Sequence, residues 1–558
     1  MINKQRAIPI VSLFSGPGGM DLGFQKAGFT TILALDCNEA AVNTYNLNDQ
    51  RGVAQQYDFS QLTGDELVAM VRKVSADQPP HGVIGGPPCQ SFSRANARKN
   101  RHDPRARLGV VFARLVKALN DAFALDFFVF ENVVGLRSSE HSHRFRTLQR
   151  ELRKAGFNLF VGDLEAGHFG VPQRRQRLFV VGINSKTLPW VKFQFPTGSV
   201  STPTVREAIG ELPQPIFYRR GLMPQNVPCH PNHWTMNPKS PKFRNGIQGS
   251  NGRSFKRLSW DKASLTVAYG NREIHVHPDG TRRLSVLEAM LLQGFPRDYI
   301  LCGSLSDQIT QISDAVPPPL AEAVAKAVRM AIYRPISVLH SRLLAWYRQH
   351  KRSFPWRQTT RSFDVLVAEK LLQQTAATDN VVQAFQNIVR EYPYWKALAR
   401  AREEDLAKIV EPLGLAYRAG ELVKLAKVVE ERYKGELPAD LESLRSLPGI
   451  GDYCARALMS FSFGKPVAVV DTNVARFLVR YFDLNLKLTQ NPARDRRLHH
   501  IADSLIPPSD SREFNLAILD LCAAHCKARN PVCQGCPLNA ECVYRLRRVA
   551  SVWPAPLD

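Results

Sequence analysis

Apolar and polar positions follow two different rhythms along this chain. In the first third, short apolar runs at 8–14, 31–35, 83–84, 127–130, 157–161 and 178–183 alternate with helix-period segments such as Val110 to Ala122. The runs are typical of buried strands. Because buried strands that alternate with helices form a mostly parallel sheet covered on both faces, the pattern predicts a doubly wound α/β domain.

The rhythm changes twice further along. From about 187 to 282, Pro, Gly, Asn and basic residues dominate, which predicts an irregular, loop-rich insert. Helical patterns return at 284–293 and 320–333, and after Arg334-Pro335 the chain is helical almost throughout, with Pro and Gly breaks. We therefore expect the main boundary near Tyr333 to Ser337, giving an α/β domain over 1–335 and an all-α domain over 336–558.

The amino-acid composition and charge indicate a folded protein and favour one class of binding partner. The chain has 558 residues, with 44% hydrophobic and 22% charged residues, which excludes wholesale disorder. Lys and Arg number 74 against 50 Asp and Glu, and an excess of +24 favours nucleic acid phosphates as the partner. No run approaches 18 apolar residues, and Met1 to Ile10 lacks a hydrophobic signal region. We expect a cytoplasmic protein that does not enter a membrane.

A glycine-rich loop follows the first predicted strand. Phe14-Ser15-Gly16-Pro17-Gly18-Gly19 precedes a helix pattern, and glycines there let the backbone approach a ligand closely. Asp36 ends the next strand, where a carboxylate can accept both hydroxyls of a ribose. Alone this pattern is weak, because a glycine-rich turn is often only a tight turn.

Two further sets of polar residues have an ordinary structural alternative. Asp58 ends a third segment, where its carboxylate could reach an adenine amine or cap a turn. Gln173, Arg175 and Arg177 alternate before a strand and would project on one face, although a solvated basic edge would show the same pattern.

Cys89 is the candidate nucleophile of the first domain. It follows two glycines and two prolines in GGPPCQSFS, which favours a stiff exposed loop over the buried position usual for a lone cysteine. A thiolate there could add to an electrophilic carbon. Glu131 leaves the same end of the sheet after FFVF, as an acid or hydrogen-bond partner.

In order along the chain, FSGPGG, GGPPCQSFS, ENV, QRRQR, RLSVLEAMLLQGFP and AVPPP closely resemble the motifs of C5 cytosine DNA methyltransferases, over about residues 8–332. The resemblance implies double-stranded DNA as substrate, with the target cytosine flipped out. It implies a target-recognition region over about 187–282 and a prokaryotic, nucleoid-associated enzyme. It also implies a cognate restriction endonuclease encoded elsewhere as a partner. The implied S-adenosylmethionine site comprises Phe14, Gly16, Gly18, Gly19, Asp36 and Asp58.

The same resemblance implies a mechanism. Cys89 adds to C6 of cytosine and makes C5 nucleophilic, while Glu131 hydrogen-bonds the N3 and amino edge. Arg175 and Arg177 hold the base and the Cys89 loop. One departure is Ser313-Asp314, where the family usually has Gly-Asn, and it concerns the edge of the cofactor site.

Four cysteines crowd near the end of the chain. Cys526, Cys533, Cys536 and Cys542 have the spacing C-x6-C-x2-C-x5-C. Four thiolates this close can hold zinc or an iron-sulfur cluster, and spacing alone does not choose between them. Four unrelated buried thiols are the alternative. Cys522, one helical turn before Cys526, is expected in the core.

Leu447-Pro448-Gly449-Ile450-Gly451 separates two helical patterns. Glycines in a tight turn expose N–H groups at a helix N-terminus, which suits a phosphate, although a plain helix connection is the alternative. Further on, Asp471 follows an apolar run and could cap the next helix or perform chemistry.

Together, this hairpin, Asp471 and the four-cysteine tail closely resemble the helix-hairpin-helix DNA glycosylase superfamily that includes endonuclease III, over about 337–545. The cysteine spacing matches that family's [4Fe-4S] cluster. FPWR at 354–357 and EKLLQQT at 369–375 resemble adenine DNA glycosylases and their thymine mismatch relatives. The implied DNA-binding residues are Gln374, as a wedge in the base stack, and Leu447, Gly449 and Gly451.

The implied excision chemistry rests on three residues. Asp471 would stabilise the charge that builds on the sugar, and Glu369 would act as an acid or position water. Bifunctional relatives place a Schiff-base lysine where this chain has Tyr453, so a monofunctional glycosylase is implied. These three residues argue against a second half that only docks on DNA.

Two observations indicate which base the second domain would excise. Tyrosine at position 453 resembles thymine mismatch glycosylases, and the 16 residues after Cys542 are fewer than the further domain of adenine glycosylases needs. Both favour thymine opposite guanine, with an adenine or uracil glycosylase as alternatives. Such a fusion would remove the thymine that arises when 5-methylcytosine deaminates.

Overall fold

The chain forms two compact units in this computed structural model. Unit 1 comprises Met1–Ser185 and Val191–Ile332, and unit 2 comprises Lys186–Trp190 and Tyr333–Asp558. Two residues with an expected role, Cys89 and Gln374, lie outside the described residues. The structure describes residues 7–75, 78–88, 107–198, 201–219, 221–244, 246–247, 255–266, 275–373, 375, 377–414, 416–484, 486 and 495–550.

Unit 1 is built on a seven-stranded sheet of order β3-β2-β1-β4-β5-β8-β6. Neighbouring strands from β3 to β5 run parallel, whereas β8 is antiparallel to both β5 and β6. The mixed α/β sheet confirms the predicted fold class of this domain. The strands are β1 (Ile8–Leu13), β2 (Phe29–Asp36), β3 (Ala54–Gln56), β4 (Gly82–Gly85), β5 (Phe127–Asn132), β6 (Phe157–Glu165) and β8 (Gln176–Asn184).

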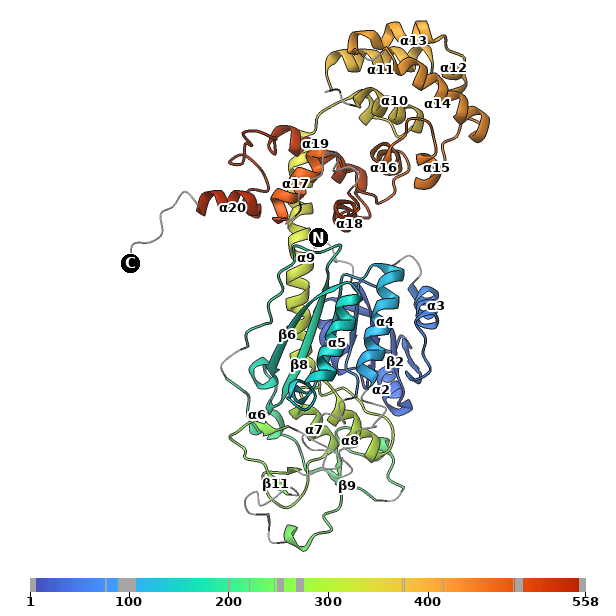
Figure 1. Cartoon of the computed structure of the whole chain (residues 1–558). Helices are drawn as coiled ribbons and strands as arrows, with labels where there is room; N and C mark the ends of the chain where they lie inside the picture. The colour runs from blue at the N-terminus through green and yellow to red at the C-terminus, as the bar shows by residue number, and fades with distance from the viewer. Residues whose placement is uncertain are drawn as a thin grey trace, which may run out of the picture. The chain divides into compact units, whose positions relative to one another are not determined.

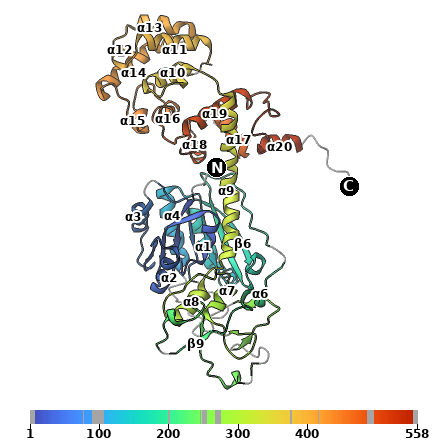
Figure 2. The ribbon, with the colours of Figure 1, turned by 180° about the vertical axis from the view of Figure 1, so that it is seen from behind.

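Helices cover this sheet on both faces. The main core lies between the sheet and α3, α4 and α5, which supply buried residues such as Leu67, Phe112 and Leu148 (Figure 1). On the face seen in Figure 2, α1 contributes Phe24 to an aromatic cluster with Phe29 and Phe127. The helices are α1 (Gly19–Lys26), α2 (Glu39–Asp49), α3 (Gly64–Ser75), α4 (Leu108–Phe123) and α5 (Ser142–Lys154).

The insert is irregular, as the loss of hydrophobic rhythm predicts. Its strands are two residues long, and its one α-helix in the described residues, α6 (Val205–Ile209), has five residues. Two further helices, α7 (Val286–Leu292) and α8 (Leu305–Asp314), follow it. The short strands are β7 (Gln173–Arg174), β9 (Ile216–Phe217), β10 (Trp234–Thr235), β11 (Lys256–Arg257), β12 (Ser264–Leu265) and β13 (His275–Val276).

The expectation that a helix ends at Tyr333 is wrong. Helix α9 runs from Pro318 to His350 and passes through Pro335 without a break. An internal proline costs about 3 kcal/mol. Burial of each large aliphatic side chain contributes about 1.5–3 kcal/mol. Ile332 before the proline and Leu339 and Leu343 after it are fully buried, so packing on both sides of Pro335 offsets its effect.

Unit 2 is helical, as predicted, around one continuous core. No helix in the described part of the chain is long and apolar enough to span a membrane. Its helices after α9 are the 3-10 turn η6 (Pro355–Arg357), α10 (Ser362–Leu372), α11 (Asp379–Glu391), α12 (Trp395–Ala399), α13 (Glu403–Val410), the 3-10 turn η7 (Glu411–Leu413), α14 (Arg418–Tyr433), α15 (Leu441–Arg445), α16 (Asp452–Phe461), α17 (Thr472–Phe482), α18 (Arg496–Ser504), α19 (Ser511–Ala524) and α20 (Val543–Ala550).

Candidate active sites

The glycine-rich loop joins β1 to α1 and leaves space beside its backbone. Gly16 has a φ of +55°, and a Cβ there would meet no atom within 4 Å. Gly19, in contrast, lies so close to the Val316 carbonyl that a Cβ would sit 2.4 Å from its oxygen. The Ser15 hydroxyl is buried and makes no hydrogen bond within the described residues. Open space beside an unsatisfied hydroxyl fits a polar ligand such as S-adenosylmethionine.

The two predicted carboxylates lie differently around this loop. Asp36, at the end of β2, accepts hydrogen bonds from the amides of Gly16 (2.8 Å) and Asn38 (2.9 Å), and burial raises its pKa. Asp58 is exposed and accepts from the Ser60 amide at 2.8 Å, which lowers its pKa. Asp36 therefore holds the glycine loop in place, whereas Asp58 caps a turn.

The segment that contains Asp58 contacts the glycine-rich loop through a pair of aromatic rings. Phe14 has a φ of +55°, and its ring stacks on Phe59 with centroids 3.7 Å apart. Since Phe59 directly follows Asp58, the structure brings Asp58 to the same end of the sheet as Gly16.

Glu131 lies at the end of β5 and is 6% exposed. Its Oε1 is 2.9 Å from Nε of Arg177. Burial raises the pKa of Glu131, while Arg177 and Arg175 act in the opposite direction. The neighbouring Asn132 donates a hydrogen bond to the Pro87 carbonyl at 3.0 Å, which fastens the GGPP segment beside Glu131. The segment that leads into Cys89 is thus held at the predicted edge of the sheet.

Arg175 has its own set of partners. Its side chain is 1% exposed, and Nη2 donates to the carbonyls of Ser313 (2.7 Å) and Ala315 (2.9 Å). Arg175 therefore anchors the segment in which the sequence departs from the methyltransferase pattern. Arg177 is also largely buried, so the alternative of a solvated basic edge is wrong for both arginines. An Arg175 contact with the Cys89 loop would involve residues outside the described ones.

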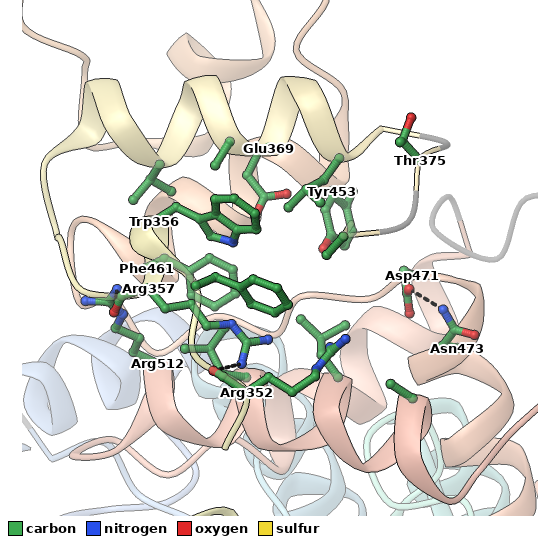
Figure 3. A pocket seen from close by; sticks show the side chains of 18 residues that line it. Arg352, Trp356, Arg357, Glu369, Thr375, Tyr453, Phe461, Asp471, Asn473 and Arg512 are labelled. Carbon is green, nitrogen blue, oxygen red and sulfur yellow. Dashed lines mark hydrogen bonds between the residues drawn. The ribbon is translucent and has the colours of Figure 1, made fainter. Parts of the chain in front are cut away.

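A pocket of about 370 Å³ in unit 2 contains the three predicted excision residues. Glu369 comes from α10, Tyr453 from α16 and Asp471 from the start of α17. Figure 3 shows Glu369, Tyr453 and Trp356 on one side of this pocket and Arg352 and Arg357 on the other. Residues separated by more than 100 positions thus share one cavity.

The charged groups of this pocket influence one another. Glu369 is 8% exposed, and burial raises its pKa to about 7, with Arg357 lowering it and Asp471 raising it. Burial and the two carboxylates raise the pKa of Tyr453 well above its ordinary value. The Glu369 carboxyl group therefore changes between its protonated and ionised forms near neutral pH, whereas the Tyr453 hydroxyl stays protonated.

Asp471 caps the next helix, one of the alternatives left open by the sequence, and it also lies at the pocket. It is the N-cap of α17, where Oδ1 accepts from the Val474 amide at 2.7 Å. Its Oδ2 accepts from the Asn473 side-chain amide at 2.8 Å, and the residue also lines the pocket. The two donors fix the direction of a carboxylate at the edge of the pocket.

Two arginines of the pocket, Arg352 and Arg357, and their partner Asp520 were given no role from the sequence. Arg357 donates to both carboxylate oxygens of Asp520, at 2.8 and 2.9 Å, and Arg352 adds two more bonds, from Nε at 2.6 Å and from its backbone amide at 3.0 Å. Asp520 is buried on α19. A lone aspartate within the apolar run ILDLC was the available signal, because a buried carboxylate needs a partner.

The hairpin between α15 and α16 has the expected form. Leu447 and Ile450 are buried in the core, and Gly449 has a φ of +68°. Gly451 is the N-cap of α16, and no side chain there accepts from the first-turn amides. The exposed amides at this helix start are suited to a phosphate oxygen.

The four predicted cluster ligands surround one small cavity of about 30 Å³. In the described part of the chain, no three His, Cys, Asp or Glu side chains meet the geometry of a metal site. The donor set nevertheless fits a cluster with thiolate ligands. Burial and the neighbouring thiols raise the pKa of Cys536 to about 11, and Arg480 Nη1 lies 3.7 Å from Cys526 Sγ. Cys522 is buried, as expected.

Comparison with known proteins decides the family. The family model of the C-5 cytosine-specific DNA methylases matches residues 8–330. The chain belongs to this family. The model of the HhH-GPD superfamily of base excision DNA repair proteins matches residues 367–501, so the methylase is fused to a second DNA-acting domain. The two predicted resemblances are confirmed, and both families imply DNA as substrate.

Each of the following relatives is similar to one of the two parts of the chain. A thymine-DNA glycosylase of Aeropyrum pernix is 38% identical over 213 residues, 38% of this chain and 95% of that protein. The type II methyltransferase M.MthTI of Methanothermobacter thermautotrophicus is 33% identical over 344 residues, 57% of this chain and 96% of that protein. A thymine/uracil-DNA glycosylase of the same organism is 32% identical over 209 residues, 37% of this chain and 93% of that protein.

Proposed function

We propose that this chain methylates cytosine at C5 in a specific DNA sequence and excises thymine from T:G mismatches. The observation that carries the second activity is the pocket that joins Glu369, Tyr453 and Asp471. The first activity rests on the family and on the fixed position of Glu131 beside the segment that leads to Cys89.

In the methylase, S-adenosylmethionine would supply an electrophilic methyl group. Phe14, Gly16, Gly18, Gly19, Asp36 and Asp58 would hold it at the carboxyl end of the sheet. The Cys89 thiolate attacks C6 of the flipped cytosine and thereby makes C5 nucleophilic. Glu131 hydrogen-bonds the N3 and amino edge of the cytosine, and Arg177 fixes the direction of its carboxyl group.

In the glycosylase pocket, breaking the N-glycosidic bond places positive charge on the sugar and negative charge on the departing base. The Asp471 carboxylate stabilises the sugar cation and orients the attacking water. Protonated Glu369 donates a hydrogen bond to a carbonyl oxygen of thymine, and Tyr453 contacts the flipped base. Arg357, held by Asp520, faces the base from the side of the pocket opposite Glu369 and Tyr453.

The same pocket contains no amine at position 453, so excision leaves an abasic site without strand cleavage. The amides of the Leu447–Gly451 hairpin bind a backbone phosphate, and Gln374 enters the space that the flipped base leaves. The four cysteines would hold a [4Fe-4S] cluster, with Arg480 beside them.

The relatives support the joining of these two activities. In Methanothermobacter thermautotrophicus, proteins similar to the two parts of this chain are separate. Deamination of 5-methylcytosine yields thymine, so the fusion removes the mutagenic product of its own methylation. A cognate restriction endonuclease encoded elsewhere and a nucleoid-associated location complete this proposal.

The test uses labelled duplexes with T:G, U:G or A opposite oxidised guanine. We expect excision at T:G, with strand cleavage only after alkali or heat, and no covalent complex on borohydride trapping. Excision of adenine alone would favour the adenine glycosylase alternative, and excision at U:G but not T:G would favour the uracil glycosylase. Bisulfite sequencing of DNA exposed to the enzyme and S-adenosylmethionine identifies the methylated site.

A further inference from the structure

We propose that Lys370, a buried lysine behind the excision pocket, is a positioning residue that holds the pocket helix to the DNA-binding hairpin. The inference rests on the proposed glycosylase function. Lys370 follows Glu369 directly on α10, yet only Glu369 lines the pocket. The two neighbouring side chains therefore point to different surroundings, one to the pocket and one to the hairpin.

The Lys370 ammonium joins three segments that are far apart in sequence. Its side chain is 2% exposed, and Nζ donates to Glu421 Oε2 on α14 at 2.9 Å. It also donates to the carbonyl of Gly449, in the hairpin, at 3.3 Å. Because a buried ammonium without partners is strongly unfavourable, these two acceptors hold α10, α14 and the hairpin in one arrangement.

The hairpin is shaped around this contact. A Cβ on Gly449 would lie 2.9 Å from the Lys370 Nζ, so glycine leaves the room that the ammonium occupies. Gly449 precedes Tyr453 by four residues. Burial and Glu369 raise the pKa of the next residue, Cys454, and the charge of Lys370 acts in the opposite direction. The ammonium therefore lies close to the first turn of α16, which carries Tyr453 into the pocket.

A second buried cation reinforces the same helix. Arg418 begins α14, one turn before Glu421, and donates to the carbonyls of Lys370 (2.8 Å) and Leu371 (3.3 Å) and to that of Gln373. These carbonyls belong to the end of α10, where helix carbonyls lack partners within the helix. The first turn of α14 thus holds both the backbone and the Lys370 side chain of the pocket helix.

This arrangement links DNA binding to excision. A DNA phosphate binds at the hairpin that contains Gly449. The hydrogen bonds of Lys370 then keep Glu369 and Tyr453 at a fixed separation while the DNA is bound. Misplacement of a reacting group by 1 Å can reduce a rate by about 100-fold. Loss of the ammonium should therefore slow excision more than it weakens binding.

Lys370→Met is a suitable test because it should still fold. Glu421 is 47% exposed, so its carboxylate remains hydrated after the lysine is removed. Methionine replaces the buried ammonium with an apolar side chain of similar length, and no uncompensated buried charge remains because Glu421 reaches water. Lys424→Met is the matched control, because Lys424 lies exposed on the same helix as Glu421.

The experiment measures the single-turnover rate on a T:G duplex and the Kd for the same duplex at low temperature, with the full chain. We expect Lys370→Met to lower the rate by about tenfold and to change Kd by less than about threefold. Lys424→Met should keep the wild-type rate. Glu421→Gln, which keeps the Gly449 hydrogen bond, should give a smaller loss than Lys370→Met.

A Lys370→Met protein that excises at the wild-type rate would overturn this inference alone. A loss of rate matched by an equal loss of binding and of melting temperature would reduce Lys370 to a structural role and would also overturn it. A wild-type chain that excises no base from any mismatch would instead overturn the proposed glycosylase function.

Discussion

Two buried glutamates, one in each unit, have nearly equal burial but different partners. Glu131 is 6% exposed and forms an ion pair with Arg177 at 2.9 Å. Glu369 is 8% exposed and forms no ion pair within the described residues; its charged neighbours are Arg357, which Asp520 engages, and Asp471. Two equally buried carboxyl groups therefore have different electrostatic surroundings, although burial raises the pKa of both.

The difference follows from the task proposed for each site. In the proposed chemistry, the methylase site relies on a thiol that adds to the base, and its glutamate only has to keep one direction beside an arginine. The excision pocket has no nucleophilic side chain in its proposed chemistry, so its carboxyl groups have to stabilise charge directly. A glutamate whose pKa is about 7 can donate a hydrogen bond at neutral pH, whereas a carboxylate can only accept one.

The largest effect should separate the two sites completely. Cys89→Ser should lower methyl transfer by at least about 1,000-fold, because a serine hydroxyl is scarcely ionised near neutral pH. Excision of thymine should stay unchanged. Transfer of labelled methyl groups to DNA measures the first activity, and retained methylation would remove Cys89 from its role as nucleophile.

The reciprocal change is Asp471→Asn. Excision should fall by about 100- to 1,000-fold, because the amide cannot stabilise the sugar cation, while binding of T:G duplexes persists. Asparagine can still cap α17. Single-turnover excision and binding assays measure both effects, with methyl transfer as the internal control. Undiminished excision would exclude Asp471 from the chemistry.

A pH series sharpens the contrast between the two glutamates. Since the pKa of Glu369 is about 7, its carboxyl group is protonated below that pH and loses its donor proton above it. Wild-type excision should therefore decrease with rising pH, by up to about tenfold per unit above pH 7. Glu369→Gln keeps a donor at every pH and should flatten the profile. A wild-type rate that increases through pH 7 would instead identify the carboxylate as the active form.

The smallest contrast concerns metal content. The purified chain should contain about four irons and be brown, because four thiolates with this spacing suit a [4Fe-4S] cluster. Removal of iron by a chelator should destabilise unit 2 and leave methyl transfer intact. Elemental analysis is the measurement, and stoichiometric zinc without iron would contradict the cluster.

Much of the α/β unit could be predicted because its central strands β1, β4 and β5 are buried on both faces. Six of the seven strands of the main sheet coincide with apolar runs, whereas β3 has the sequence AQQ and carries no such signal. Pairing with β2 alone makes this segment a strand. Packing likewise keeps α9 helical at Pro335, although an internal proline disfavours a helix.

The sites show the same limit. Motifs identified Glu369, Tyr453 and Asp471, and the structure gathers them in one pocket. The partners of the site's charged groups could not be predicted, because they come from distant segments. Arg357 and Asp520 are 163 positions apart, and Lys370 and Gly449 are 79 apart. No local spacing relates such pairs, so only the folded chain reveals them.

The uninterrupted helix α9 has a practical consequence for anyone who wishes to express the two activities as separate polypeptides. A cut at Pro335 would divide one helix and create two new ends, with unpaired carbonyls on the first fragment and unpaired amides on the second. The fragments would then lose cooperative support that neighbouring turns give each other. A glycosylase fragment should therefore begin several turns upstream of Tyr333, and a methylase fragment should end several turns downstream, so that each carries a duplicated copy of the shared segment.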